Sequence, residues 1–319
     1  MKRPGIVFLD VDTLGEVTGF YQLTKLGNLT VYPSSLPQQR IERILGREIV
    51  ITNKVVIDRE VMEACPTLKL ICIAATGKNN IDLACAEEKG ILVKNVAGYS
   101  TESVVQHTFA MLFYLGSHMP YYDQFVKNGD YARNSLFTHL GKPFFELAGK
   151  NYGIIGLGTI GKRIAEVASS FGARIQYYST TGKNVNTPYT SVSLDQLLHD
   201  SDIISIHCPL TEATHNLIGY DQLCRMKKEA ILINAGRGGI VNEAALAQAL
   251  DEGRIDAAAL DVLEKEPPEV SNPLFRIKQP DKLLITPHIA WASRESRERL
   301  MDGIIRNISE YLRGAHTVL

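Results

Sequence analysis

The segment NYGIIGLGTIGKRIAEVASSFGARIQYYS, residues 151–179, restricts the possible folds of this chain more than any other. It reads as a strand, a glycine-rich turn, a helix and a second strand. Gly156 permits the tight turn, Gly158 lets the backbone approach a pyrophosphate, and Gly161 lets the helix pack closely on the strand. This context is what a GxGxxG dinucleotide site requires, so the segment predicts one. A glycine-rich turn without a ligand is the alternative.

The residues that follow the motif bear on which dinucleotide is bound. Thr159 and Ile160 begin the predicted helix, whose free N–H groups suit phosphates. An enzyme that uses NAD places Asp or Glu about 20 residues after the glycines, on the ribose 2′-hydroxyl. This chain instead has Ser179 and Thr180, with Lys183 close behind. Neutral hydroxyls and a lysine do not repel a 2′-phosphate, so we expect NADP(H) or NAD(H), with a slight preference for NADP(H).

Short β-rich runs alternate with helical patterns along the whole chain, which predicts parallel sheets with helices on both faces. At 319 residues the chain suits two domains, both α/β and doubly wound. A long helical stretch (101–118) ends the first series, and the last predicted helix (292–313) could return to the first domain. We therefore expect a dinucleotide-binding Rossmann domain at 101–289 and a discontinuous substrate domain made of 1–100 plus 290–319.

Charge and cysteine content exclude several classes of protein. The formal net charge is −1, which gives no general attraction to nucleic acid or to an anionic membrane. No apolar run reaches the 18 or so residues of a membrane span, and the N-terminal run is shorter than the core of a signal peptide. The five cysteines form no CxxC pair and read as reduced structural thiols, so we expect a cytoplasmic protein without a metal site.

Three chemically active residues each follow the apolar run of a predicted strand. Arg237 is framed by glycines in NAGRGG, Glu266 precedes two prolines, and His288 follows Pro287. The carboxyl ends of parallel strands meet at one edge of a sheet, where such sheets bind their ligands. A guanidinium suits a carboxylate, and a carboxylate beside an imidazole orients the ring and favours its protonated form. The trio therefore predicts an anion-binding proton-transfer site.

Each of these residues has an inert alternative. An arginine in a glycine loop can be solvated, a Glu–Pro–Pro loop can lie on the surface, and most single histidines are not catalytic. Of the eight histidines, His107 and His199 read as structural. His207 ends a predicted strand near the expected cofactor and, with Pro209 of the same HCPLT motif, is expected to line that site.

Over nearly its whole length the chain resembles the D-isomer-specific 2-hydroxyacid dehydrogenases. The motifs that carry the resemblance are ATGKNNID (75–82), NVAGYSTESVVQH (95–107), ELAGKNYGIIGLGTIG (146–161), HCPLT (207–211), NAGRG (234–238), DVLEKEP (261–267) and TPHIAW (286–291). The resemblance implies two Rossmann-like domains with the active site in the cleft between them, and reduction of a 2-oxo acid by hydride from a nicotinamide. It also implies a homodimer joined through the nucleotide domain, with the segment near 120–148 as an arm.

The resemblance further implies a role for each matching residue. His288 would donate the proton, Glu266 would pair with its imidazole, and Arg237 would hold the substrate's carbonyl and carboxylate. The backbone amides of Thr76 and Gly77 would bind the carboxylate from the other domain, so that domain closure assembles the site. Asp261 would contact the nicotinamide carboxamide.

Within the family, Glu266 argues against a formate dehydrogenase, which would have Gln there. The block TPHIAWAS resembles glycerate dehydrogenases, also called hydroxypyruvate and glyoxylate reductases, and the indole of Trp291 would shrink the pocket to suit a small acid. Packing at a domain interface is the alternative for Trp291. Lys78 stands where relatives carry an uncharged residue, so it either reaches the distal end of the substrate or is a solvated loop lysine.

Two other functions share these features. One is a phosphoglycerate dehydrogenase-like enzyme without a regulatory domain. The other is a nucleotide-sensing corepressor that resembles the C-terminal binding proteins, which can keep the Arg, Glu and His of the site. Turnover of a 2-oxo acid separates an enzyme from a sensor.

Overall fold

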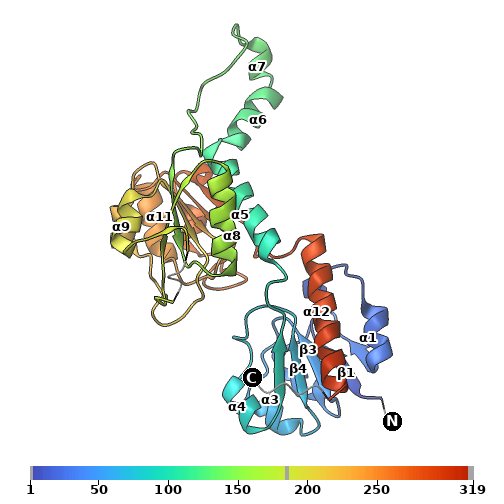
Figure 1. Cartoon of the computed structure of the whole chain (residues 1–319). Helices are drawn as coiled ribbons and strands as arrows, with labels where there is room; N and C mark the ends of the chain where they lie inside the picture. Colours follow the sequence, from blue (N-terminus) through green and yellow to red (C-terminus); the bar gives the residue numbers. More distant parts are fainter. Residues whose placement is uncertain (1–2, 184–186, 315–319) are drawn as a thin grey trace. The chain divides into compact units, whose positions relative to one another are not determined.

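The computed structural model describes residues 3–183 and 187–314. The chain divides into two compact units, which are treated separately below (Figure 1). Unit 1 comprises Met1–Ser100 with Trp291–Leu319, and unit 2 comprises Thr101–Ala290. Each unit contains one sheet in which every pair of neighbouring strands is parallel. The expected fold class, two α/β parallel-sheet domains, is confirmed.

The sheet of unit 1 has the strand order β2-β1-β3-β4-β5. Its strands are β1 (Gly5–Phe8), β2 (Asn28–Val31), β3 (Ile49–Thr52), β4 (Leu70–Ile73) and β5 (Leu92–Asn95). The central strands β3 and β4 are buried at every position, which explains their unbroken apolar sequences IVIT and LICI. Because the order reverses at β1, the point where strand connections change direction lies between β1 and β3.

Helices cover both faces of this sheet. One face carries α1 (Phe20–Leu26) and α12 (Arg294–Leu312), and the other carries α2 (Arg40–Ile44), α3 (Arg59–Ala64) and α4 (Leu83–Glu88). Helix α12 buries Leu300, Met301, Ile304 and Ile308 in the core of unit 1. Asp58 and Asp82 cap α3 and α4 by accepting the N–H groups of Val61 and Cys85.

The sheet of unit 2 has the order β12-β11-β10-β9-β6-β7-β8. Its strands are β6 (Asn151–Ile155), β7 (Arg174–Tyr178), β8 (Thr190–Ser191), β9 (Ile203–Ile206), β10 (Ile231–Asn234), β11 (Ala257–Leu260) and β12 (Leu283–Ile285). Helices α5 (Thr101–Gly116) and α8 (Thr159–Ser170) pack on one face, while α9 (Leu194–Asp200), α10 (Tyr220–Arg225) and α11 (Glu243–Asp251) pack on the other (Figure 1). The change of direction lies between β6 and β9, which is where a doubly wound sheet binds its ligand.

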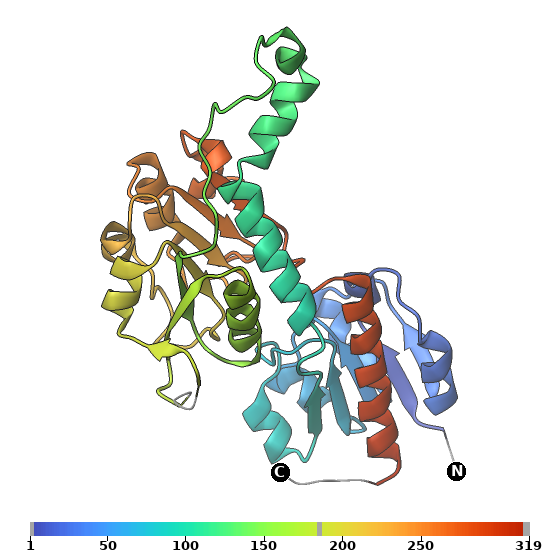
Figure 2. The same ribbon diagram turned by 45° about the horizontal axis from the view of Figure 1, so that its top comes forward.

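Two short helices extend beyond the body of unit 2. They are α6 (Met119–Lys127) and α7 (Asp130–Arg133), and both views show them projecting from the end of α5 (Figures 1 and 2). The loop that follows α7 exposes several large apolar side chains, with Phe137 at 90% and Leu140 at 79% exposure. We call residues 119–144 the arm.

Local differences from the sequence-based expectation have simple causes. In place of the predicted helix 38–45, the structure has a 3-10 turn, Pro37–Gln39, followed by the five-residue helix α2. Helix α2 ends because the backbone of Leu45 is no longer helical and Gly46 takes a φ of 75°. The predicted helix 101–118 ends at Gly116, and His118 adopts a left-handed conformation before α6 begins. In the part of the chain that the structure describes, no helix is both long and apolar enough to cross a membrane.

Candidate functional site

The turn between β6 and α8 has the stereochemistry expected of the glycine motif. Gly156 has a φ of 93°, and a Cβ on it would lie 2.7 Å from the backbone nitrogen of Cys208. A Cβ on Gly161 would lie 2.2 Å from the carbonyl oxygen of Gly156. A Cβ on Gly158 would meet no atom within 4 Å. Packing therefore explains two of the glycines, whereas open space above Gly158 is what a dinucleotide phosphate needs.

The first turn of α8 supports the same reading. The helix begins at Thr159 and continues through Ile160, with Gly158 as its N-cap and, among the described residues, no side-chain cap hydrogen bond. The N–H groups at this end are thus available to an anion, and the helix dipole favours one. These features fit a dinucleotide pyrophosphate on the residues that the sequence indicated.

The loop after β7 contains the residues expected near the ribose. The Oγ atom of Ser179 is buried and has no hydrogen-bond partner among residues 3–183 and 187–314. Thr180 is half-buried and Lys183 is exposed, and the backbone N–H of Lys183 lies 3.4 Å from the hydroxyl of Thr181. A buried hydroxyl costs free energy unless a partner satisfies it, so the Ser179 hydroxyl fits a ligand oxygen.

The loop after β9 runs beside the glycine turn, because the N–H of His207 donates to the carbonyl of Ile155 at 2.8 Å. The Nε2 atom of His207 lies 3.0 Å from the hydroxyl of Ser205. Its Nδ1 atom is buried without a partner in the described residues. Burial lowers the pKa of His207 to about 3, so the ring is neutral at pH 7. Pro209 is exposed, and its carbonyl accepts from Thr214.

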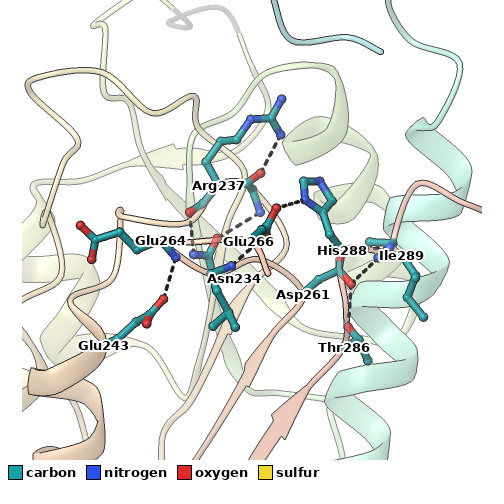
Figure 3. A network of polar contacts seen from close by, with 12 residues as sticks. Asn234, Arg237, Glu243, Asp261, Glu264, Glu266, Thr286, His288 and Ile289 are labelled. Atoms are coloured by element: carbon teal, nitrogen blue, oxygen red, sulfur yellow. Dashed lines mark hydrogen bonds and ion pairs between the residues drawn. The ribbon is translucent and has the colours of Figure 1, made fainter. Parts of the chain in front are cut away.

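His288 and Glu266 form a direct pair on the loops after β12 and β11 (Figure 3). The Nδ1 atom of His288 lies 2.7 Å from Oε2 of Glu266. The other carboxylate oxygen accepts the backbone N–H of Leu263 at 3.0 Å, which fixes the carboxylate relative to its own loop. The side chains are 24% and 33% exposed, so a small molecule can reach the pair. The geometry is that of an imidazole oriented by a carboxylate.

Asp261, just beyond β11, anchors the loop that carries His288. Its carboxylate is 1% exposed and accepts the N–H groups of Ile289 and Ala290 at 2.8 and 2.9 Å. It also accepts the hydroxyl of Thr286 at 2.6 Å, and its carbonyl accepts the N–H of His288 at 2.8 Å. His288 has a φ of 55°, an uncommon conformation for a residue other than glycine. The contacts of Asp261 with the backbone of residues 288–290 hold His288 in this conformation. The expected contact of Asp261 with the nicotinamide stays a prediction.

Arg237 lies in the loop after β10. A Cβ on Gly238 would fall 1.8 Å from the carbonyl oxygen of Leu263, so only glycine lets this loop approach the loop after β11. Asn234 closes the turn, since its amide donates to the carbonyl of Arg237 and its oxygen accepts the N–H of Gly236. The guanidinium donates to the carbonyl of Gly236 at 2.8 Å. In Figure 3 the side chains of Arg237, Glu266 and His288 lie above the contacts that Asn234 and Asp261 make.

The structure adds supporting residues that the sequence analysis did not place at the site. His107 on α5, interpreted from the sequence as structural, has Nε2 3.0 Å from the Thr286 hydroxyl and 3.6 Å from the Asp261 carboxylate. Glu243 at the start of α11 accepts the N–H of Glu264 and the amide of Asn272, which braces the loop before Glu266. Asn234 and Thr286 lie inside quoted motifs, and their position at strand ends is the signal that could have identified them.

The remaining expected substrate residues belong to unit 1. Thr76 and Gly77 follow β4, where the Thr76 hydroxyl donates to the carbonyl of Val96 at 3.2 Å and the Thr76 carbonyl accepts from Asn95 at 2.6 Å. Lys78 is half-buried. Trp291 packs against the core of unit 1 and meets the ring of Tyr99 edge to face, with centroids 6.3 Å apart. These contacts favour a packing role for Trp291, and its contact with substrate stays a prediction.

Comparisons with known proteins agree with this geometry. Residues 109–290 match the family model described as D-isomer specific 2-hydroxyacid dehydrogenase, NAD binding domain. The glycerate dehydrogenase of Methylorubrum extorquens is 37% identical over 310 residues, which cover 97% of this chain and 96% of that protein.

Two solved structures are similar over most of their length. A Sinorhizobium meliloti NADPH-dependent glyoxylate/hydroxypyruvate reductase, in complex with NADP and malonate, has a TM-score of 0.83 and 25% identity, covering 98% of this chain and 94% of that one. The D-lactate dehydrogenase of Aquifex aeolicus, complexed with NAD and lactic acid, has a TM-score of 0.83 and 28% identity, covering 97% and 96%. Together with the family match, this similarity shows that the chain belongs to the D-isomer-specific 2-hydroxyacid dehydrogenase family of nicotinamide-dependent oxidoreductases.

Proposed function

We propose that this protein reduces a small 2-oxo acid, hydroxypyruvate or glyoxylate, to the D-2-hydroxy acid. The observation that carries the proposal is the 2.7 Å pairing of His288 with Glu266 beside the loop of Arg237. The names of the relatives support the choice of acid, since hydroxypyruvate and glycerate are the 2-oxo and 2-hydroxy forms of one small acid.

The proposed roles follow from the contacts. The bound nicotinamide dinucleotide supplies the hydride. His288 donates a proton from Nε2 to the substrate's carbonyl oxygen, because Nδ1 is engaged by Glu266. The carboxylate of Glu266 stabilises the charged imidazolium before the proton is transferred. Because it binds Nδ1, it also directs Nε2 of His288 away from the Glu266 loop. Arg237 offers two parallel N–H donors to the substrate's carboxylate and carbonyl.

The remaining assignments concern how the acid is held. The backbone amides of Thr76 and Gly77 bind its carboxylate. Lys78 lies two residues beyond Thr76 and is half-buried, which supports contact with the distal end of the substrate. Trp291 packs against Tyr99, and its proposed second role is to limit the length of the side chain that the site accepts, which suits CH₂OH or H.

We also propose that the protein uses NADPH and NADH, with a modest preference for NADPH. The support is the partnerless hydroxyl of Ser179 in the described residues, together with Thr180 and the exposed Lys183. A carboxylate at Ser179 would repel a 2′-phosphate, and none is present. Among similar structures, one binds NADP and another NAD, so the fold accepts both.

The protein is proposed to be a homodimer that is joined through the arm of unit 2, and to reside in the cytoplasm. Contiguous exposed apolar surface on a monomer usually marks an interaction site. The arm exposes Leu136, Phe137, Leu140 and Phe144 by 61% or more. A cavity of about 430 Å³ at its base, lined by residues of α5, α6 and segment 280–284, offers a place for a second copy's side chains. All five cysteines are free, which agrees with a reducing compartment.

Steady-state kinetics test the proposed activity. Hydroxypyruvate, glyoxylate, pyruvate and 3-phosphohydroxypyruvate are each offered with NADPH and with NADH, and oxidation of the dinucleotide is followed by absorbance. We expect the highest kcat/KM with hydroxypyruvate or glyoxylate. A preference for the phosphorylated acid would support the phosphoglycerate dehydrogenase alternative. No turnover of any acid, with dinucleotide binding intact, would support the nucleotide-sensing alternative.

A further inference from the structure

Asp10, two residues beyond the end of β1 in unit 1, has a carboxylate that accepts from three consecutive backbone N–H groups. Its side chain is buried, at 3% exposure. The backbone N–H groups of Asn53, Lys54 and Val55 donate to it at 2.9, 2.6 and 3.2 Å. The hydroxyl of Thr52 lies 3.2 Å from Oδ2. Such charge-assisted bonds in a buried site are the strong kind, so Asp10 fixes the course of the chain that leaves β3.

This contact lies at the point of unit 1 where ligands are expected. In the order β2-β1-β3-β4-β5, the connections change direction between β1 and β3, and Asp10 and Asn53 follow the carboxyl ends of those two strands. Open parallel sheets bind ligands in the crevice beyond this point. Asp10 therefore orders the loop after β3 at the edge of the sheet where a ligand is expected.

The segment that Asp10 fixes is connected to the loop after β4. The side-chain amide of Asn80 donates to the carbonyls of Val55 and Asn53 at 3.0 and 3.5 Å. The carbonyl of Asn80 accepts the N–H of Ile57 at 2.9 Å. Segment 53–57 therefore forms one wall of the loop 76–80, and Asn95 holds the opposite end of that loop through the Thr76 carbonyl.

We infer that Asp10 is a positioning residue for binding of the 2-oxo acid. It acts through segment 53–57 and Asn80 on the backbone amides of Thr76 and Gly77, and so presents them in one fixed conformation. The inference rests on the proposed function, because it needs those amides to bind the substrate carboxylate. It assigns Asp10 no contact with substrate or with the dinucleotide.

The test compares Asp10→Asn with Glu48→Gln in the full-length protein. An amide at position 10 keeps the shape but turns one acceptor into a donor that faces other N–H groups. Glu48 precedes the same strand β3 at its opposite end, where it accepts from the hydroxyl of Tyr311 at 2.8 Å, so its variant controls for loss of a carboxylate in unit 1. We expect Asp10→Asn to raise KM for hydroxypyruvate about tenfold, with kcat within twofold and the Kd for NADPH unchanged. Glu48→Gln should change none of the three.

Amide hydrogen exchange gives a second readout that does not need turnover. Asp10→Asn should speed exchange in segments 53–57 and 76–82, whereas Glu48→Gln should leave both as in the wild type. If Asp10→Asn is insoluble, Asn80→Ala is measured in its place and should raise KM in the same way. If Asp10→Asn had the same KM as the wild type and the same rates of amide exchange, the inference would be overturned. Altered exchange with no turnover in the wild type would instead refute the proposed function alone.

Discussion

The Nδ1 atom of His288 lies 2.7 Å from Oε2 of Glu266, and the backbone of Leu263 holds the other oxygen of that carboxylate. The Glu266 carboxylate therefore orients the imidazole, and the backbone N–H of Leu263 holds that carboxylate in place. This is the arrangement expected of a general acid that must present one nitrogen to a substrate oxygen.

Replacement of His288 by Gln should abolish most turnover. Loss of a general acid typically lowers kcat by about 10²- to 10⁴-fold, and Gln cannot donate a labile proton from the same position. The Kd for NADPH, measured by fluorescence titration, should stay within about twofold because the glycine turn is untouched. His199→Gln is the matched control, since His199 is an exposed residue of α9 with an 84% exposed side chain. A normal kcat in His288→Gln would refute the proton-donor role.

Two substitutions in the glycine motif should separate ligand binding from packing. Gly158→Ala adds a methyl group in open space at a φ of −79°, so the free energy of unfolding should change by less than about 1 kcal/mol. The Kd for NADPH should nevertheless rise by about tenfold or more, because the methyl group occupies the path of the pyrophosphate.

Gly161→Ala should behave in the opposite way. Its methyl group would lie 2.2 Å from the Gly156 carbonyl, so we expect unfolding to be easier by about 1–3 kcal/mol. Urea denaturation without dinucleotide provides the comparison. If Gly158→Ala binds NADPH as tightly as the wild type, the phosphates do not lie over this turn.

The fold class was predictable because its signal is local and repeated. Runs such as DIISIH, AILINAG and DAAALDV are mostly apolar, as expected for strands of a parallel sheet that is covered on both faces. Helix α1 was not predicted, since its sequence FYQLTKL spans only seven residues and fully buries only Leu23. The family was predictable because each of its motifs is a short continuous segment at the end of a strand, so it can be identified in the sequence alone.

The supporting network of the site was much less predictable. His107 and Thr286 are 179 residues apart, and no local pattern indicates that a helical histidine meets a threonine at a strand end. Asp10 reads from the sequence only as an acidic end to a strand, because its three donors come from another strand's loop. Burial and hydrogen bonds between distant segments decide these roles. The roles proposed for Arg237, Thr76, Gly77, Lys78 and Trp291 stay predictions.

Ser179→Asp should reverse the preference between the two dinucleotides. A carboxylate there would accept from a ribose 2′-hydroxyl and repel a 2′-phosphate, so kcat/KM for NADPH should fall by about 10- to 100-fold while that for NADH is kept or rises. Ser191→Asp on the exposed strand β8 adds the same charge one strand away and should leave the ratio as it is. Parallel kinetics with both dinucleotides give the answer, and an unaltered ratio in Ser179→Asp would remove this residue from the ribose site.

His207, whose Nδ1 atom is buried, should make the protein sensitive to acid. The pKa of His207 is about 3 when folded and 6.5 for an ordinary histidine. Between these values the unfolded chain binds one proton more than the native protein, so stability falls as the pH falls through that window, by at most about 1.4 kcal/mol per pH unit. Urea unfolding at pH 7, 6, 5 and 4 should show a steeper loss in the wild type than in His207→Asn. Equal slopes would mean that His207 becomes protonated in the native state.

The arm provides the last prediction. Phe137 and Leu140 are 90% and 79% exposed, and a homodimer that is joined there would bury both. The double substitution Phe137→Asp and Leu140→Asp should therefore convert a dimer of about twice the chain mass into a monomer, as measured by light scattering after size-exclusion chromatography. Val270→Asp is the matched control, because Val270 is also 90% exposed but lies in the loop after Glu266. A wild-type protein that elutes as a monomer at micromolar concentration would contradict the dimer. A dimer that survives the double substitution would place the interface elsewhere.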